Sequence, residues 1–349
     1  MSFTQGHTHI AKGAAILLLL YYHVFAAYSD LHFNLAQIAH CCVWIFVFLS
    51  GYGLTVSYGK SRQKSTSPLS WILKHVWSLE AFFWPHFLIG VALLYLWVGR
   101  GLMSQYGKVW RIILDFFCLS DIFGQTHILS VWWYMGLAIL IVPAVPLLVK
   151  VTDKIGYFII PVVYALILLV PDLIVKDELT GPYQGYYLAA VLGVVAARKG
   201  LLDKYVTYIE KASSSRTIVL GLLYIFAIIS LGMLIVPAEA GARFYLPQLI
   251  MTVNAVLVIL LSVNIAKAAD ISKAFVFMGK LSDDMFIMHI VVRTVLWDLI
   301  YIVDIPVVIY LLLLISSTLV TWGFKAIKKL AGYDKLVSKV SSKLEFKTH

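Results

Sequence analysis

Ten long apolar segments, separated by short polar ones, dominate the hydrophobic pattern of the chain. A helix needs about 20 mostly apolar residues to cross the roughly 30 Å hydrocarbon core of a membrane. The apolar runs are unbroken rather than alternating, which predicts helices. We therefore expect an all-α membrane protein, a bundle of about ten transmembrane helices over residues 10–28, 37–58, 72–98, 131–149, 156–175, 183–198, 217–237, 244–266, 284–302 and 305–324.

The composition indicates the same class of protein. Hydrophobic residues make up 61% of the 349 residues and charged residues only 13%. An ordinary soluble domain has about 45–50% and about 25%, respectively. The chain has too little polar surface to cover itself in water, which excludes a soluble enzyme and a nucleic-acid-binding domain. Its three cysteines, Cys41, Cys42 and Cys118, match neither a disulfide framework nor a metal-ligand spacing, and we expect no bound metal.

The positions of Lys and Arg predict the orientation of the bundle. With the amino terminus in the cytoplasm, 22 of the 28 fall on the cytoplasmic side, five fall outside and Arg293 lies within a span. This asymmetry follows the positive-inside rule and predicts that both termini are cytoplasmic in a multi-pass protein of the plasma (inner) membrane. It also accounts for the net charge of +10 without a nucleic-acid partner.

We expect one ten-span domain over residues 1–324, followed by a basic tail over 325–349. Apolar residues recur at helical spacing in the tail, with lysines between them. This pattern is typical of an amphipathic helix on the anionic inner leaflet, and a solvated lysine-rich tail remains the alternative.

Ionisable residues inside predicted spans are costly, and they are candidates for function by default. The main ones are His23, Glu80, His86, His289 and Arg293. Each has a structural alternative. Glu80 and Arg293 can pair to hold helices together, and His86 can cap a carbonyl freed by Pro85.

Lys12 and His23 lie 11 residues apart in the first predicted span. On a helix this spacing corresponds to a rise of about 16 Å and returns to nearly the same face. Lys12 would then lie at the cytoplasmic mouth, with His23 beyond mid-membrane on the same side. The pair suits a long ligand with an anionic end and a reactive tip, because an imidazole can accept a proton at neutral pH.

Four segments of the chain resemble the acyltransferase-3 family of integral membrane enzymes. They are KGAAILLLLYYH at 12–23, WIFVFLSGY at 44–52, SVWWYM at 130–135, and MGKLS with FIMH at 278–289. The family patterns are Arg or Lys, ten residues, then His; F-F-x-x-S-G-F/Y; a W-F/Y-L/I stretch; and G-x-x-S-x-x-x-Y-L-x-H. The four matches occur in the family's order, within matching spans, and cover most of the chain.

The resemblance implies ten core spans, acyl-CoA as donor and a hydroxyl acceptor, often on a sugar of an exported glycan. By this analogy Lys12 contacts the phosphates of the coenzyme and His23 is catalytic, while Ser50 lies in a donor-binding motif. The family's R-x-x-R-x-x-P pattern is missing after the second span. Its place is taken by Lys74, the further phosphate contact that we expect. Asp283 and Asp284 follow Ser282, and their role is left open.

The other candidate residues have weaker support. Glu80 is expected at a depth similar to that of His23, where it can orient the imidazole. His289 and Arg293 share a helix face and are candidates for charge pairing or for polarising the thioester. Trp132 and Trp133 suit either a membrane-interface belt or a platform for a sugar, and His127 is a candidate contact for sugar hydroxyls.

We therefore expect a membrane-bound O-acyltransferase that moves an acyl group, expected to be acetyl, from acyl-CoA to a hydroxyl of a sugar, exported polysaccharide or glycolipid. His23 acts either as a general base or as a covalently acylated intermediate. No permanently bound cofactor is expected, and the expected partners are acyl-CoA, the glycan acceptor and the bilayer. The alternative is a multi-span transporter or flippase without acyl chemistry. The oligomeric state cannot be predicted.

Overall fold

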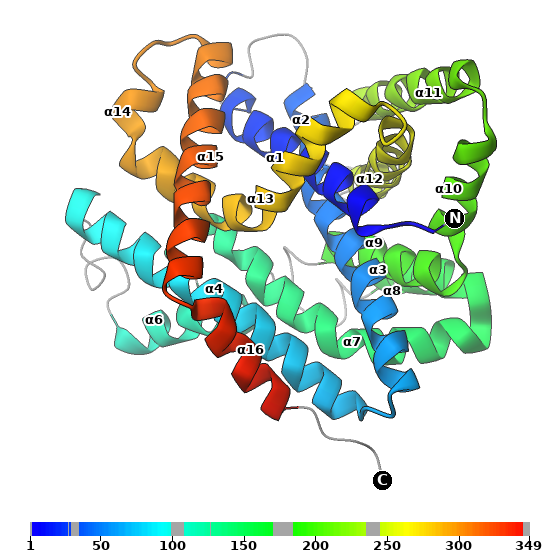
Figure 1. Cartoon of the computed structure of the whole chain (residues 1–349), viewed down its shortest axis with the longest axis horizontal. Coiled ribbons are helices and arrows are strands. Elements are labelled where there is room, and N and C mark those ends of the chain that lie inside the picture. The colour runs from blue at the N-terminus through cyan, green and yellow to red at the C-terminus, as the bar shows by residue number, and fades with distance from the viewer. Residues whose placement is uncertain are drawn as a thin grey trace. The chain divides into compact units, whose positions relative to one another are not determined.

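The computed structural model describes residues 2–26, 28, 35–98, 108–125, 127–169, 184–234 and 245–344, and in these residues the chain is helical without a β-strand (Figure 1). Among the described residues, seven segments are long and apolar enough to cross a membrane: Gln5–Phe25, Leu35–Gln63, Pro68–Leu96, Ser130–Ile167, Ser214–Met233, Leu246–Ile265 and Pro306–Leu330. The helix pair Gly185–Arg198 and Leu201–Lys211, bent by 67°, raises the number to eight if it forms one broken span. The all-helical membrane class is thus confirmed.

The number of ten spans and the orientation of the termini stay predictions. The fourth and fifth predicted spans fall in the single 38-residue segment Ser130–Ile167. The ninth predicted span lies mostly in α13 (Ala269–Val295), whose first half carries several charged residues. Residues 170–183, at the junction of the fifth and sixth predicted spans, lie outside the described residues, as do Arg100, Lys176, Arg243 and Lys347.

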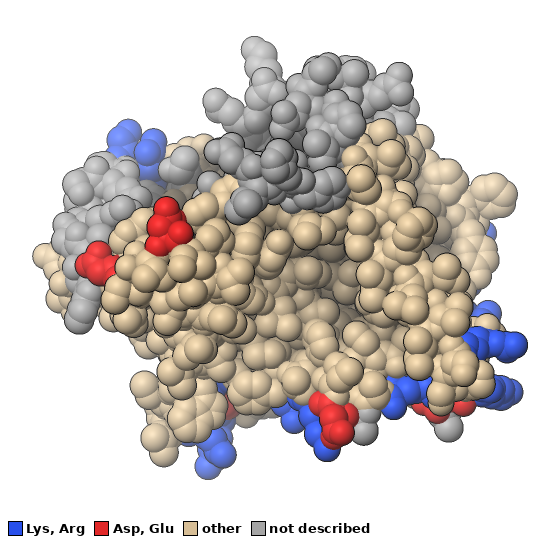
Figure 2. Space-filling view, turned by 90° about the horizontal axis from the view of Figure 1, so that it is seen from above, with Lys and Arg blue, Asp and Glu red and all other residues tan. Residues whose placement is uncertain are grey.

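Apolar side chains form much of the exposed surface of the described helices. On α11 (Ser214–Met233), Leu222, Leu223 and Phe226 are 60%, 55% and 70% exposed. The described residues across the middle of the face in Figure 2 are mostly tan, with the Lys and Arg gathered toward its edges. Such a surface is stable when lipid hydrocarbon covers it.

The chain forms two compact units, which are described separately below. The first holds the described residues within 1–55, 148–173 and 182–283, and the second holds those within 56–147 and 284–349. Helices α3 (Cys42–Gln63), α7 (Trp133–Ile155) and α13 each contribute to both units.

In the first unit, α12 (Tyr245–Ile265) packs against α1 (Gln5–Phe25), α9 (Gln184–Arg198), α10 (Leu201–Lys211) and α11. The short helix α2 (Leu35–Ala39) packs against α1 and α11, and the η3 turn (Gly156–Phe158) leads into α8 (Ile159–Leu169), which packs on α9. The core between them is aliphatic, with Ile16, Leu20 and Ile259 fully buried.

Two helix crossings in the first unit depend on reciprocal glycines. A Cβ on Gly13 of α1 would clash with the Phe275 carbonyl oxygen of α13, and a Cβ on Gly279 would clash with the His9 carbonyl oxygen. The same holds for α3 and α9, where Gly51 meets Ala190 and Gly193 meets Phe48. Small residues let membrane helices approach backbone to backbone. Gly13, Gly51 and Gly279 belong to the family motifs found in the sequence, and the close helix crossings explain why glycine occupies these positions.

The second unit contains α4 (Pro68–Val98), α6 (Val109–Phe116), the turns η1 (Asp121–Phe123) and η2 (Ser130–Trp132), α14 (Trp297–Ile300), α15 (Pro306–Leu330) and α16 (Tyr333–Lys343). Helix α16 lies along α4 (Figure 1). Helix α15 continues without a break through position 324, where the sequence placed the end of the ten-span domain.

The tail helix α16 supplies a hydrogen bond that α4 lacks. Pro85 has no N–H, which leaves the Ala81 carbonyl of the preceding turn without its helical donor. The Tyr333 hydroxyl donates to that carbonyl oxygen at 2.8 Å. The expectation that His86 caps the freed carbonyl is therefore wrong, because the His86 Nδ1 donates to Phe82 instead.

The described part of the tail is consequently a helix packed on α4. The Val337 and Leu344 carbonyl oxygens of this segment accept hydrogen bonds from Trp77 Nε1, at 3.4 Å, and Ser70 Oγ, at 2.5 Å. Its lysines Lys335, Lys339 and Lys343 are exposed. An amphipathic helix thus packs on a neighbouring helix and keeps its lysines exposed, and its binding to the anionic inner leaflet stays a prediction.

Candidate active site

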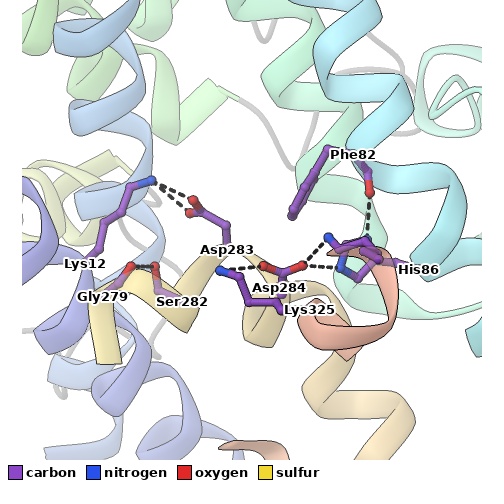
Figure 3. A network of polar contacts seen from close by, with 9 residues as sticks. Lys12, Phe82, His86, Gly279, Ser282, Asp283, Asp284 and Lys325 are labelled. Carbon is purple, nitrogen blue, oxygen red and sulfur yellow. Dashed lines mark hydrogen bonds and ion pairs between the residues drawn. The ribbon is translucent and has the colours of Figure 1, made fainter. Parts of the chain in front are cut away.

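Helix α1 carries both Lys12 and His23, as the sequence predicts. The Lys12 ammonium donates to both carboxylate oxygens of Asp283, at 2.9 and 3.0 Å (Figure 3). The side chains of Lys12 and Asp283 are 24% and 52% exposed, respectively. The crossing at Gly13 and Gly279 fixes this pairing, since it holds α1 against α13 one residue from Lys12 and four from Asp283. The residue expected to meet the donor's phosphates therefore already has an anionic partner.

His23 is half-buried in an aromatic part of the first unit. The Tyr22 ring contacts the His23 imidazole edge-on, with centroids 5.4 Å apart, and stacks on His40 at 4.5 Å. Trp44 lies edge-on to His40 at 5.4 Å, and its indole donates to the Gly185 carbonyl at 2.9 Å. Such surroundings suit a reactive imidazole screened from bulk water. Ser50, also half-buried, lies on α3 in the same unit, next to the crossing glycine Gly51.

Glu80 belongs to the second unit, on α4, and is 8% exposed. Its Oε2 accepts a hydrogen bond from Trp84 Nε1 at 3.1 Å, and the Trp84 ring stacks on Phe116 at 5.2 Å. Because Glu80 and His23 lie in different units, the expectation that one orients the other stays a prediction. Lys74 is half-buried on the same helix.

The second unit contains a buried polar cluster that the sequence did not predict. Asp284, 3% exposed, accepts from the His86 imidazole at 2.9 Å and from the Lys328 ammonium at 2.6 Å, and Lys325 lies 3.2 Å from its other oxygen (Figure 3). His86 is fully buried. The sequence did offer a signal, namely His86 and two acidic residues near predicted spans, but nothing in it linked them to lysines some 40 residues later.

His289 and Arg293 lie one turn apart on α13, as expected, but hold different partners. The His289 Nδ1 donates to the Phe286 carbonyl at 2.9 Å, and the residue is fully buried. The Arg293 Nε donates to the Tyr301 hydroxyl at 2.8 Å, and its guanidinium lies over the Trp297 ring. In the described part of the chain no ion pair joins Arg293 to Glu80, so the predicted structural pairing of these two residues is wrong.

The two tryptophans expected at the outer interface differ in burial. Trp132 is 1% exposed, and its indole donates to the Ile287 carbonyl at 3.2 Å. With Phe83 packed edge-on at 5.2 Å, Trp132 has the contacts of a packing residue and no exposed face for a sugar. Trp133 is half-buried and remains a candidate.

His127 forms a buried pair with Asp115 at the end of α6. Its Nδ1 donates to Asp115 Oδ1, while the Ile128 N–H donates to the other oxygen at 2.9 Å. Ser120 adds a third donor at 3.3 Å. These bonds close the loop between α6 and η2, so His127 has a structural role besides its predicted contact with the acceptor.

The described residues contain no group of three or more His, Cys, Asp or Glu that could hold a metal ion. The three cysteines are buried and free. Burial raises the pKa of the Cys118 thiol, with Glu80 and Asp115 adding to the effect. A protonated, buried thiol is a poor nucleophile. The histidines are therefore the stronger candidates for covalent chemistry.

The fold and these buried ionisable residues define a multi-pass, all-helical membrane protein of the kind that enzymes and transporters share. A family model described as an acyltransferase domain matches residues 9–326. The chain thus belongs to the acyltransferase-3 family of membrane acyltransferases, as its motifs indicated. No curated protein and no solved structure matches the chain.

Proposed function

We propose that this protein is an O-acyltransferase of the plasma (inner) membrane that moves an acetyl group from acetyl-CoA to a hydroxyl of a sugar, exported polysaccharide or glycolipid. The observation that carries the proposal is the family match over residues 9–326, which includes both Lys12 and His23. The placement of these two residues on one helix, with a rise of about 16 Å between them, supports it.

In the proposed reaction the coenzyme's phosphates meet Lys12 and Lys74, and the pantetheine arm extends along α1 toward His23. As general base, His23 removes the proton of the acceptor hydroxyl while the oxygen attacks the thioester carbonyl. The C–S bond then breaks, and the coenzyme leaves as a thiol after taking up that proton. In the covalent route, His23 itself attacks the carbonyl, the C–S bond breaks, and the coenzyme leaves as a thiol with the proton that the imidazole gives up. The acceptor hydroxyl then attacks the acyl-imidazole, the C–N bond breaks, and the hydroxyl proton returns to His23.

The remaining candidates have supporting roles in this proposal. Glu80 orients the catalytic imidazole, Ser50 contributes to the donor site, and His289 and Arg293 polarise the thioester. His127 and Trp133 contact the acceptor. Bound acyl-CoA, the glycan acceptor and the lipid bilayer are the proposed partners.

The test is transfer of label from radiolabelled acetyl-CoA by protein purified into nanodiscs, with membrane-extracted glycans as acceptors. Label on a glycan with wild-type protein, and none with the His23→Ala variant, is the expected result. Transport of substrate without any acetylated product would instead favour a transporter or flippase. Binding of acetyl-CoA without the acceptor would identify the donor site separately.

A further inference from the structure

The hydrogen-bond partners of His86 indicate the charge of the His86–Asp284 pair. The His86 Nδ1 lies 2.7 Å from the Phe82 carbonyl oxygen, which has no proton to give, so Nδ1 carries one. The His86 Nε2 lies 2.9 Å from Asp284 Oδ1, and a second proton must lie between them. Whether the imidazole or the carboxyl holds that proton, the pair carries no net charge.

Two ammonium groups join this neutral pair. Lys328 Nζ lies 2.6 Å from Asp284 Oδ1, and Lys325 Nζ lies 3.2 Å from Oδ2. The Lys328 side chain is only 14% exposed, and its ammonium lies 4.7 Å from the centre of the Phe324 ring and 5.2 Å from that of Phe82. The four side chains together carry two positive charges in a largely buried place.

An excess of buried positive charge is costly, and an anion that comes between the lysines relieves the cost. Lysine ammonium groups are common phosphate ligands. The Lys325 side chain, 40% exposed, marks the side from which an anion can enter. Asp284 contacts both ammonium groups and so holds them in position.

We propose that His86, Asp284, Lys325 and Lys328 form a binding site for a dianionic phosphoryl group. The site is formed by other residues than Lys12 and Lys74, the expected contacts for the donor's phosphates. It goes beyond the proposed function, because phosphate binding needs neither the acyl donor nor the acceptor. The phosphoryl group can come from a soluble nucleotide or from the headgroup of a lipid.

The experiment is calorimetric titration of inorganic phosphate into the full chain in phosphatidylcholine nanodiscs at pH 7.5. The wild type is expected to bind, and Lys328→Gln is expected to weaken binding about tenfold or more, as loss of one charge-assisted hydrogen bond does. Lys329→Gln is the matched control. It removes the same charge from the next, exposed residue of α15 and should leave affinity within about twofold.

Lys325→Gln, at the exposed side of the cluster, is a second variant that weakens binding even if Lys328→Gln fails to fold. No phosphate binding by the wild type would overturn the proposal. Equal weakening by Lys328→Gln and Lys329→Gln would also overturn it, since that result indicates general attraction by positive charge.

Two further arms distinguish the source of the phosphoryl group, and either result supports the site. Competition by adenosine 5′-monophosphate indicates a nucleotide, and loss of phosphate binding in nanodiscs that contain phosphatidic acid indicates a lipid. Phosphate binding in a protein without acetyl transfer would reject only the proposed function. Acetyl transfer by a protein that binds no phosphate would reject only this site.

Discussion

Lys12 and Asp283 form a two-point ion pair, with the ammonium 2.9 and 3.0 Å from the two carboxylate oxygens. If Lys12 binds the donor's phosphates, the phosphate must compete with Asp283. The pair is partly exposed, so the carboxylate is a modest competitor, of about 0.2–1 kcal/mol.

Because of this competition, substitutions of Lys12 and of Asp283 should change the KM for acetyl-CoA in opposite directions. Lys12→Gln should raise the KM for acetyl-CoA about tenfold with little change in kcat, because it removes a charge-assisted contact to the donor. Asp283→Asn should lower that KM up to about fivefold, because it frees the ammonium. Steady-state kinetics with varied donor measure both, and an unchanged KM in Lys12→Gln would reject the phosphate role.

Replacement of His23 tests the catalytic step. His23→Ala should lower kcat about 10²–10⁴-fold, the usual contribution of a general base, while the protein still inserts and binds acetyl-CoA. His7→Gln is a suitable control on the same helix, since glutamine can keep the capping box that His7 completes with Thr4. Full activity of a folded His23→Ala protein would remove this residue from the mechanism.

Because α1 crosses α13 at glycines, we expect Gly13→Ala and Gly53→Ala to differ strongly in their effect on the free energy of unfolding. Gly13→Ala should lower the free energy of unfolding by about 1–3 kcal/mol, because the new Cβ clashes with the Phe275 backbone. Gly53→Ala is the matched control on α3, where a Cβ meets nothing within 4 Å, and it should leave stability unchanged or slightly higher. Unfolding in detergent titrated with SDS compares the two, and equal effects would mean that the crossing is looser than described.

The hydrogen bond between Tyr333 and Ala81 can be tested by a double-mutant cycle. Tyr333→Phe should lower the free energy of unfolding by about 1–3 kcal/mol, because it leaves a buried carbonyl without a donor. In a Pro85→Ala background the residue 85 N–H can supply that donor, so Tyr333→Phe should cost less there. The same cost in both backgrounds would show that Tyr333 stabilises by packing alone.

The long apolar helices could be predicted from the sequence because composition alone specifies a span in lipid. The first helix shows this best, since local pattern places a span over 10–28, close to the observed Gln5–Phe25, with both Lys12 and His23 on it. The spans are less predictable where the turn at Gly156 divides the segment Ser130–Ile167 into α7 and α8, and where charged residues lie in the first half of α13. There the length of a helix depends on its neighbours.

The partners of the candidate residues could not be predicted in the same way. The contact between Lys12 and Asp283 joins residues 271 positions apart, and the one between Lys328 and Asp284 joins residues from separate helices. The burial of Trp132 was also not predictable, because a tryptophan at a predicted membrane interface can equally fill a core. Hydropathy records only the cost of exposing a side chain to water, so it cannot say which neighbour will surround it.

The bond from Tyr333 also has a consequence for biosynthesis. The donor follows its carbonyl by 252 residues, so at roughly 5–20 residues per second the ribosome reaches Tyr333 some 10–50 s after Ala81 has been made. Until then the proline-containing helix α4 carries an unsatisfied polar group, and water or the insertion machinery has to shield it. A truncation after Leu330 would leave the nascent protein permanently in that unfinished state, and quality-control proteases would be expected to remove it.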